Sequence, residues 1–517
     1  MKRVSLILLA VLLMLTSSLV ACTKTKQVLV SDGYSEFVYE SGTEDTNATD
    51  NDKNGNADKA SSKATGADKD GTTTVTVAFN SFRPTDIEPL LTEFKKLYPN
   101  IKIKVDYYNS SSDTSKEYIA NKSAAGKLPD IVFDDIAQLP LYVSQGIVYP
   151  LTKFVKNDKE FNYIPKYIID TYTYGGDLYA LPHQAYFTSI VFNLDLMDSL
   201  NLDMPELDWT VEDFIKLSKK GYTKNNYAID DDNFFESYFA PLYSTGATNY
   251  GYVEKTRTFD INALVKSLQL QAELRDIPGL VGYTARFGSS GEKSDYYKLV
   301  GSEDQFAATK NGKSLMLDLQ RGTYNYSFID ELCDGFEWCF WPYPQNSANP
   351  GRMPVHIDHA WMTTAVKNPE AAFTVLRYLT YSKEGNLARL NAYINADSGK
   401  YSLNLPYYTP ITVQPDVKAT YEKLMKKMSG NSLTYETALY QYKNLEKCFR
   451  GDAEKFIPSF SQSWLDNATV AVNKMRDGRD YSGAAALQKK ATNAIQDYWK
   501  DFETKLAKVK KDNKDLY

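Results

Sequence analysis

The segment Thr74–Tyr107, TVTVAFNSFRPTDIEPLLTEFKKLYPNIKIKVDY, decides the fold class of this 517-residue chain. Apolar residues alternate with polar or small ones from Val75 to Phe79 and again from Ile101 to Tyr107, which predicts two strands. Between them, the apolar residues of Ile87–Leu97 follow helical spacing, and Pro89 is tolerated in a first helical turn. A strand, a helix and a strand within 34 residues have the size of a βαβ unit, so the strands should be parallel.

The next segments extend the same pattern. A second helix is predicted over 114–125, and Pro129–Asp135 is a short apolar run that ends in polar residues, as in a strand buried on both faces. The fold class is therefore α/β with a doubly wound, mostly parallel sheet. Ligands of such sheets bind outside the carboxyl ends of the strands. This places Asn80, Arg83, residues 108–111, Asp134 and Asp135 on the candidate rim.

The composition limits the classes of function. The chain is 43% hydrophobic and 24% charged, so it can build one or two cores without metals or disulfides. Its net charge of −6 argues against nucleic-acid binding, which needs a basic surface. The aromatic fraction is 13%, with 39 Tyr. Cys333, Cys339 and Cys448 fit either buried free thiols or one disulfide with one thiol left over.

The N-terminal residues predict export and an anchor. Lys2 and Arg3 precede the apolar run Val4–Leu15, which is too short to span a bilayer but suits a signal peptide over 1–21. Residues 19–22, Leu-Val-Ala-Cys, resemble the lipobox of bacterial lipoproteins, which implies lipid on Cys22; an incidental Cys after an ordinary signal peptide is the alternative. Residues 22–72 are rich in small and polar residues and predict a flexible tether to the membrane on its extracytoplasmic side.

Several short motifs, in this order, resemble the extracellular solute-binding proteins of family 1, the carbohydrate-binding lipoproteins of ABC importers. The motifs are Tyr98–Ile103, Gly126–Val132, Tyr174–Pro182, Val191–Leu196, Asp208–Phe214, Gly312–Met316 and Pro369–Phe373. The resemblance implies a periplasmic-binding-protein-like fold with two α/β lobes, a multi-strand hinge and a ligand cleft. The expected first lobe is 73–186 plus 360–405, and the second is 187–359 plus 406–517, with C-terminal helices packed on the second lobe. Crossings between lobes are expected near 185–191, 356–362 and 405–411.

The resemblance also implies a function. The chain would capture a carbohydrate, most simply an oligosaccharide, and deliver it to a transmembrane permease as a monomer without a cofactor. A sensory or adhesion lipoprotein of the same fold is one alternative. A secreted polysaccharide-cleaving enzyme is another, because glycoside hydrolysis needs only two carboxyl groups. We favour a protein that is not an enzyme, since the sequence contains no G-x-G-x-x-G, Walker, H-E-x-x-H or G-x-S-x-G motif.

A sugar site needs polar groups for hydroxyls and aromatic rings for the apolar faces of the sugar. The candidate ligand-binding residues are Asn80, Arg83, Asp134, Asp135, Tyr186, Phe187, Arg321, Trp341, His359 and Trp361. Trp361 is the preferred stacking residue, and Trp209 is expected to be structural. No metal site is expected: Asp230–Asp232 fits a solvated turn better than a calcium site, and the two His of 356–359 would point to opposite faces of a strand.

Overall fold

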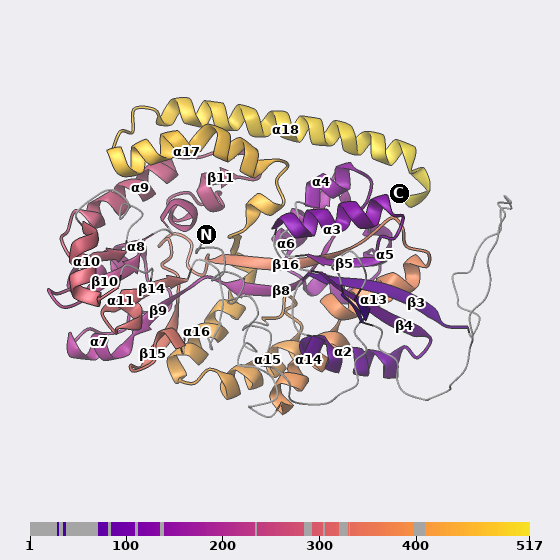
Figure 1. Ribbon diagram of the computed structural model, residues 1–517, viewed down its shortest axis with the longest axis horizontal. Coiled ribbons are helices and arrows are strands. Elements are labelled where there is room, and N and C mark those ends of the chain that lie inside the picture. Colours follow the sequence, from indigo (N-terminus) through magenta and orange to yellow (C-terminus); the bar gives the residue numbers. More distant parts are fainter. Residues whose placement is uncertain are drawn as a thin grey trace, which may run out of the picture.

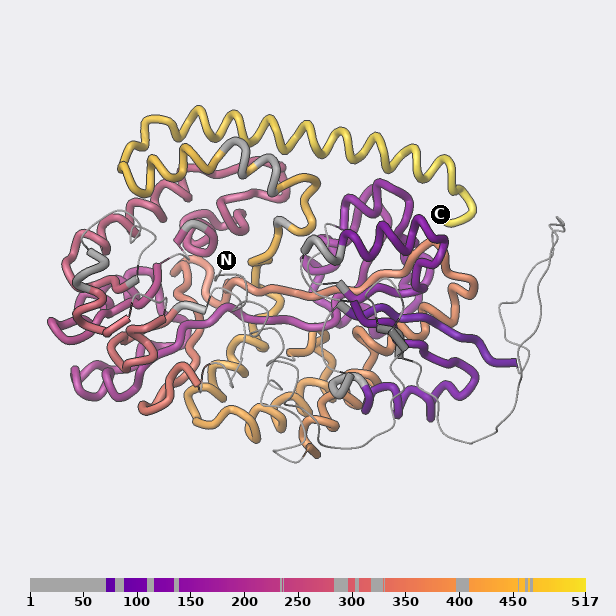
Figure 2. Tube along the Cα trace, viewed as in Figure 1, coloured from indigo at the N-terminus to yellow at the C-terminus, as the bar shows by residue number. Residues whose placement is uncertain are grey.

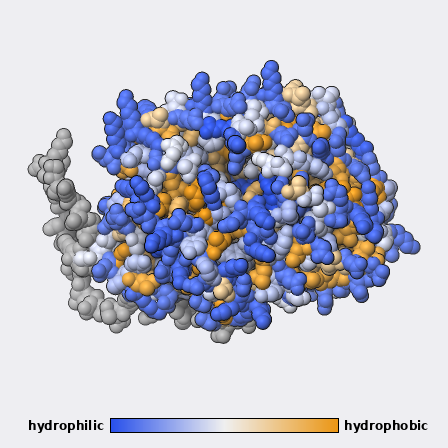
Figure 3. Space-filling view, turned by 180° about the vertical axis from the view of Figure 1, so that it is seen from behind, coloured by the Kyte–Doolittle hydropathy of each residue, from blue (hydrophilic) through white to orange (hydrophobic). Residues whose placement is uncertain are grey.

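The computed structural model describes residues 28–29, 35–37, 71–80, 84–108, 112–134, 139–232, 235–283, 292–302, 306–319, 329, 331–396 and 409–517. Two sheets lie side by side with helices around them, and a long helix runs along the top of both (Figure 1). Hydrophilic side chains cover most of the rear face, with apolar ones scattered between them (Figure 3). Among the helices in these ranges, none is long and apolar enough to cross a membrane.

The first sheet contains the predicted βαβ unit. Its strand order is β1 (Val28–Leu29), β2 (Ser35–Phe37), β4 (Ile101–Tyr108), β3 (Thr73–Asn80), β5 (Ile131–Asp134), β16 (Pro354–Met362) and β17 (Phe449–Arg450), with β8 (Leu181–Phe187) also paired to β16. Strand β3 is parallel to both β4 and β5, which confirms the prediction. The carboxyl ends of β3, β4 and β5 therefore meet at one edge of the sheet, where the sequence places the candidate ligand-binding residues.

The helices of the first lobe cover both faces of this sheet. They are α2 (Pro84–Leu97), α3 (Ser112–Ala124), α4 (Leu139–Ser144), α5 (Thr152–Val155), α6 (Lys166–Thr171), α13 (Pro369–Thr380), α14 (Lys383–Asn395) and α15 (Pro415–Met428), together with the short hairpin β6 (Thr173–Tyr174)–β7 (Asp177–Leu178). The sequence assigned α15 to the second lobe, whereas its buried Tyr421 and Met425 belong to the apolar cluster of the first sheet. Strand β2, inside the predicted tether, adds to the outer edge of β4.

The second sheet has the order β13 (Val281–Tyr283), β10 (Tyr227–Asp231), β14 (Ser314–Leu319), β9 (Ser189–Asn193) and β15 (Trp338–Pro342). Its helices are α7 (Leu194–Ser199), α8 (Val211–Lys220), α9 (Ile261–Arg275), α10 (Glu292–Val300), α11 (Ala307–Lys310) and α17 (Phe460–Gly478), with the hairpin β11 (Tyr252–Val253)–β12 (Thr258–Phe259). Two more helices, α16 (Ser432–Lys443) and α18 (Ala484–Asp512), contact both lobes. Trp209 is buried as predicted, and its indole nitrogen donates to the carbonyl oxygen of Pro342 at 2.8 Å.

The chain crosses between the sheets where β8 ends and β9 begins, which confirms the first predicted crossing. Figure 2 shows the chain of β8 running beside β16 and then continuing into β9 in the other half. The second crossing was predicted at 356–362 and that position is wrong. Strand β16 pairs only within the first sheet, so the chain returns from β15 before Pro354. Of the third crossing only residues 409–411 are described, and Thr409 bridges to Ala185.

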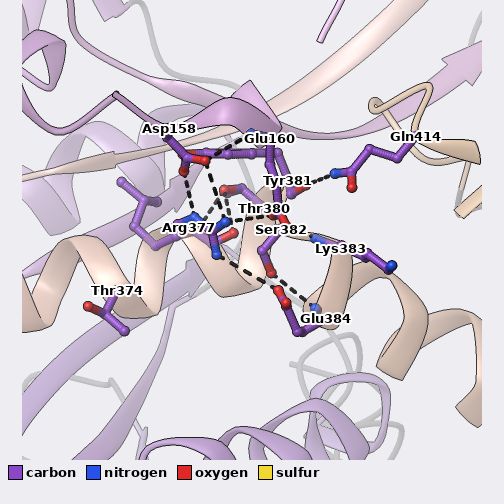
Figure 4. A network of polar contacts seen from close by, with 12 residues as sticks. Asp158, Glu160, Thr374, Arg377, Thr380, Tyr381, Ser382, Lys383, Glu384 and Gln414 are labelled. Carbon is purple, nitrogen blue, oxygen red and sulfur yellow. Dashed lines mark hydrogen bonds and ion pairs between the residues drawn. The ribbon is translucent and has the colours of Figure 1, made fainter. Parts of the chain in front are cut away.

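A polar network fastens the end of α13 to the short helical turn η1 (Lys159–Tyr163) of the first lobe (Figure 4). Arg377 bonds to Asp158 and to Glu160, each at 2.6 Å. Burial opposes ionisation of Asp158, but hydrogen bonds from Arg377 and Tyr381 outweigh it and lower the pKa of this carboxyl. The network therefore fixes the segment that leads towards the third crossing.

The start of α8 shows how local sequence sets a helix boundary. The hydroxyl of Thr210 accepts from the backbone nitrogen of Asp213, and the Asp213 carboxylate accepts from the backbone nitrogen of Thr210. We expect Thr210→Ala to lower the free energy of unfolding by about 1 kcal/mol, because the backbone nitrogen of Asp213 loses the hydroxyl that accepts its hydrogen bond. Urea unfolding measures this loss. Thr92→Ala, at an exposed position inside α2, is the matched control and should cost nothing; equal losses in both variants would contradict the capping role.

Candidate functional site

Strands β8 and β16 pair antiparallel and form a two-stranded ribbon between the lobes. Alternation along each strand gives this ribbon two different faces. The side chains of one face are buried in the first apolar cluster: Ala185, Phe187, Val355 and Ile357. The side chains of the other face are half-buried and polar: Gln184, Tyr186, His356 and Asp358. We call this second set the polar ribbon.

The register brings the polar ribbon together. Tyr186 is the cross-strand partner of His356, and Gln184 is the partner of Asp358. The amide nitrogen of Gln184 donates to Asp358 Oδ2 at 3.2 Å. From the second lobe, the Tyr238 hydroxyl lies 2.9 Å from Nε2 of His356. The polar ribbon therefore offers an amide, a carboxylate, an imidazole and one phenol ring, and Tyr238 adds a second phenol from the other lobe.

Glycine at position 451 permits the contact between the lobes. A Cβ on Gly451 would lie 3.0 Å from Nε2 of His356 and 3.2 Å from the Tyr238 ring. Both distances are shorter than relaxed van der Waals contacts. A larger residue would therefore push His356 and Tyr238 apart.

A buried ion pair supports the ribbon from its edge. Arg450 Nε bonds to Asp452 Oδ1 at 2.7 Å, and both side chains are at most 1% exposed. Arg450 also donates to the carbonyl oxygen of Ile357 at 2.9 Å and to the hydroxyl of Tyr172 at 3.0 Å. Burial alone would raise the pKa of Asp452, but the charges of Arg450 and Lys455 outweigh it and hold that pKa well below its usual range. The pair thus fixes the backbone of β16 beside His356 and Asp358.

Four of the residues expected to bind ligand are core residues. Phe187, Trp341, His359 and Trp361 are at most 4% exposed. Trp361 stacks on Tyr142 with ring centroids 5.5 Å apart, and His359 lies beside the rings of Tyr172 and Phe456. Burial lowers the pKa of His359 to about 3, so this imidazole is neutral. Since these side chains expose no face for stacking, they belong to the apolar cores and not to the polar ribbon.

The other expected residues divide into three groups. Tyr186 lies on the polar ribbon. Asn80 and Asp134 end strands β3 and β5, where the backbone of Asn80 is paired with that of Tyr108 and the backbone of Asp134 with that of His359. Arg83, Asp135 and Arg321 lie outside the described residues.

Sequence reasoning missed part of the polar ribbon. His356 and Asp358 alternate with buried residues along β16, and this period of two is the signal in the sequence that marks their face. Tyr238 carries no such signal, because it approaches His356 from a position 118 residues earlier in the chain.

The acidic run Asp230–Asp232 is a structural feature, and the prediction of a solvated turn was wrong. Asp230 accepts from the backbone nitrogen and hydroxyl of Thr309, and burial raises its pKa to about 6. Asp232 pairs with Arg275, and both are buried. Within the described ranges, no group of His, Cys, Asp and Glu could hold a metal ion. Cys333, Cys339 and Cys448 are free, buried thiols.

A model of the family described as bacterial extracellular solute-binding protein matches residues 90–398. The fold is similar to a sugar transporter structure from Rhizobium etli in an open conformation, with 17% identity, a TM-score of 0.61, and coverage of 82% of this chain and 99% of that chain.

Two further structures have the same fold. An ABC substrate-binding protein from Listeria monocytogenes in complex with cycloalternan has 17% identity and a TM-score of 0.57, over 82% of this chain and 98% of that one. A solute-binding protein of an ABC transporter from Thermotoga lettingae, bound with α-D-tagatose, has 15% identity and a TM-score of 0.54, over 82% and 99%. At these identities the likeness establishes the fold, and it confirms the expected periplasmic-binding-protein-like architecture.

Proposed function

Because the chain belongs to the bacterial extracellular solute-binding protein family, we propose that it is the substrate-binding lipoprotein of an ABC importer. It captures a carbohydrate between its lobes, an oligosaccharide by preference, and delivers it to a membrane permease. Lipid on Cys22 holds it at the outer side of the cell membrane, and residues 22–72 link the anchor to the lobes. It acts as a monomer and has no enzymatic activity.

The polar ribbon is the observation that carries this proposal. Sugar hydroxyls both donate and accept, so they are matched by the Asp358 carboxylate, the Gln184 amide and the His356 imidazole. The Tyr186 ring is half-buried and can cover an apolar sugar face. The Listeria and Thermotoga proteins of the same fold hold sugars, which supports a sugar as the ligand here.

The same residues favour binding over hydrolysis. A glycosidase needs two carboxyl groups on either side of the scissile bond. The polar ribbon contains one carboxylate, Asp358, and a hydrogen bond from Gln184 already engages it. A sensory lipoprotein would use the same site, and it differs in lacking a permease; uptake of the ligand by cells separates these two roles.

A thermal-shift screen of mono- to hexasaccharides, including uronic acids, tests the proposal. A ligand at 100 times its Kd stabilises the folded state by about 2.7 kcal/mol. Asp358→Ala should then weaken binding of the selected sugar by roughly 10- to 100-fold, the value of a hydrogen bond to a charged group. Asp501→Ala, on the exposed side of α18, is the control. Failure of every sugar to shift the melting temperature, or full affinity in Asp358→Ala, would contradict the proposed site.

A further inference from the structure

Helix α18 is attached to both lobes. It runs for 29 residues, about 43 Å at 1.5 Å per residue, along the top of the molecule from α17 to α4 (Figure 1). One stripe of apolar side chains follows its whole length at spacings of three and four residues. In the first half, Leu487, Ala491 and Ile495 are buried in an apolar cluster with residues of α17 and α9. In the second half, Phe502 and Leu506 are buried in the core of the first lobe. The sequence had assigned the whole helix to the second lobe.

The middle of α18 contacts both lobes through one side chain. The indole nitrogen of Trp499 donates to the hydroxyl of Tyr252, on β11 of the second lobe, at 3.1 Å. The same ring lies 6.2 Å from the ring of Tyr174, on β6 of the first lobe. The guanidinium of Arg257 covers it at 4.0 Å. Trp499 therefore marks the place where the helix passes from one lobe to the other.

Polar contacts complete the attachment to the first lobe. Lys510 donates to the carbonyl oxygen of Gly175 at 2.8 Å and forms an ion pair with Asp177. Gly175 has a φ of +56°, and a Cβ there would lie 3.1 Å from Leu506. The β6–β7 turn thus has the shape that lets α18 approach closely.

We propose that α18 is a strap that holds the two lobes in the arrangement seen here. The β8–β16 ribbon can bend, but a continuous helix keeps its length, so turning one lobe against the other must displace an end of α18. The first-lobe end yields first, because α18 packs there on the short α4 and on the β6–β7 turn, whereas its other end packs along α17, α9 and β12. The strap thereby sets the population of lobe arrangements, and with it the apparent affinity for any ligand bound between the lobes.

Distance measurements between spin labels test the strap directly. One label is placed on α3 through Glu117→Cys and one on α8 through Lys220→Cys, in the full chain with Cys22→Ser; the three other thiols are buried. The double variant Phe502→Ala/Leu506→Ala should broaden the distance distribution and add a component that the parent lacks. Lys510→Glu replaces the ion pair with Asp177 by repulsion between two negative charges. This substitution opens no cavity, and it should shift the distance distribution in the same direction.

The control is the double variant Thr504→Ala/Lys508→Ala, which alters exposed positions of the same turns and should leave the distribution unchanged. A parent-like distribution in Lys510→Glu and in the folded Phe502→Ala/Leu506→Ala protein, with folding checked by circular dichroism, would overturn the strap. All samples are measured without sugar. The result therefore does not depend on whether the ligand is a carbohydrate.

Discussion

Asp452→Ala should lower the free energy of unfolding by about 3–5 kcal/mol, because Arg450 would keep a buried charge without its partner. Arg450 is 1% exposed and takes both carboxylate oxygens of Asp452, at 2.7 and 3.0 Å. Guanidinium unfolding followed by tryptophan fluorescence measures the loss.

Two further variants separate this effect from a general cost of removing a carboxylate. Asp501→Ala removes one from an exposed pair with Lys505 and should cost about 0–1 kcal/mol. The double variant Arg450→Met/Asp452→Leu removes both buried charges and should recover most of the stability. A loss in Asp452→Ala no larger than in Asp501→Ala would show that the buried pair does not stabilise the hinge.

The same pair predicts a dependence on pH. The pKa of Asp452 is lowered in the folded state, so its contribution to stability is fully present above the unfolded value of about 3.9. That contribution is lost as the pH falls below this value towards the folded pKa. The stability difference between the parent and Asp452→Ala should therefore shrink in acid. Asp230, whose pKa is raised to about 6, acts in the opposite direction but cancels in this difference, because both proteins contain it.

Trp361→Ala should lower the free energy of unfolding by about 3–5 kcal/mol and leave sugar affinity per folded molecule unchanged. The Trp361 side chain is 0% exposed and stacks on Tyr142, so its removal leaves a cavity in the first lobe. Thermal melts give the loss of stability, and calorimetric titration at a temperature where the variant is folded gives the affinity. Trp361→Phe keeps a ring in place and should lose less stability. A Trp361→Ala variant that keeps its stability but no longer binds the sugar would show that Trp361 contacts the ligand.

Local sequence patterns were sufficient to predict the first strands and helices and the family of the chain. The alternation and helical spacing of Thr74–Tyr107 predicted strand, helix and strand, and parallel pairing followed because a helical crossover joins the two strands. The apolar residues of 484–502 recur at helical spacing, which is a local pattern typical of a helix such as α18. Both patterns depend on neighbours in the sequence, which is why they can be read without tertiary contacts.

The binding site could be predicted only in part, and Trp361 and His356 show why. Both lie on β16, which was expected to carry ligand contacts, but they occupy opposite faces of that strand. The face with Trp361 meets Tyr142 and the first apolar cluster, whereas the face with His356 meets Tyr238 of the second lobe. The sequence around β16 does not indicate which face of the strand a distant helix will cover.

By itself, the sequence of this protein determined the α/β class, the order of the first strands and helices from Thr74 to Asp135, and membership of the solute-binding family, because periodicity and short motifs are local properties. Only the tertiary structure decided that Gln184, Tyr186, His356 and Asp358 form one polar face, and that α18 is attached to both lobes. The physical reason is the same in both cases. A periodic pattern shows which side chains share a face, but the partner that covers the face comes from segments more than a hundred residues away.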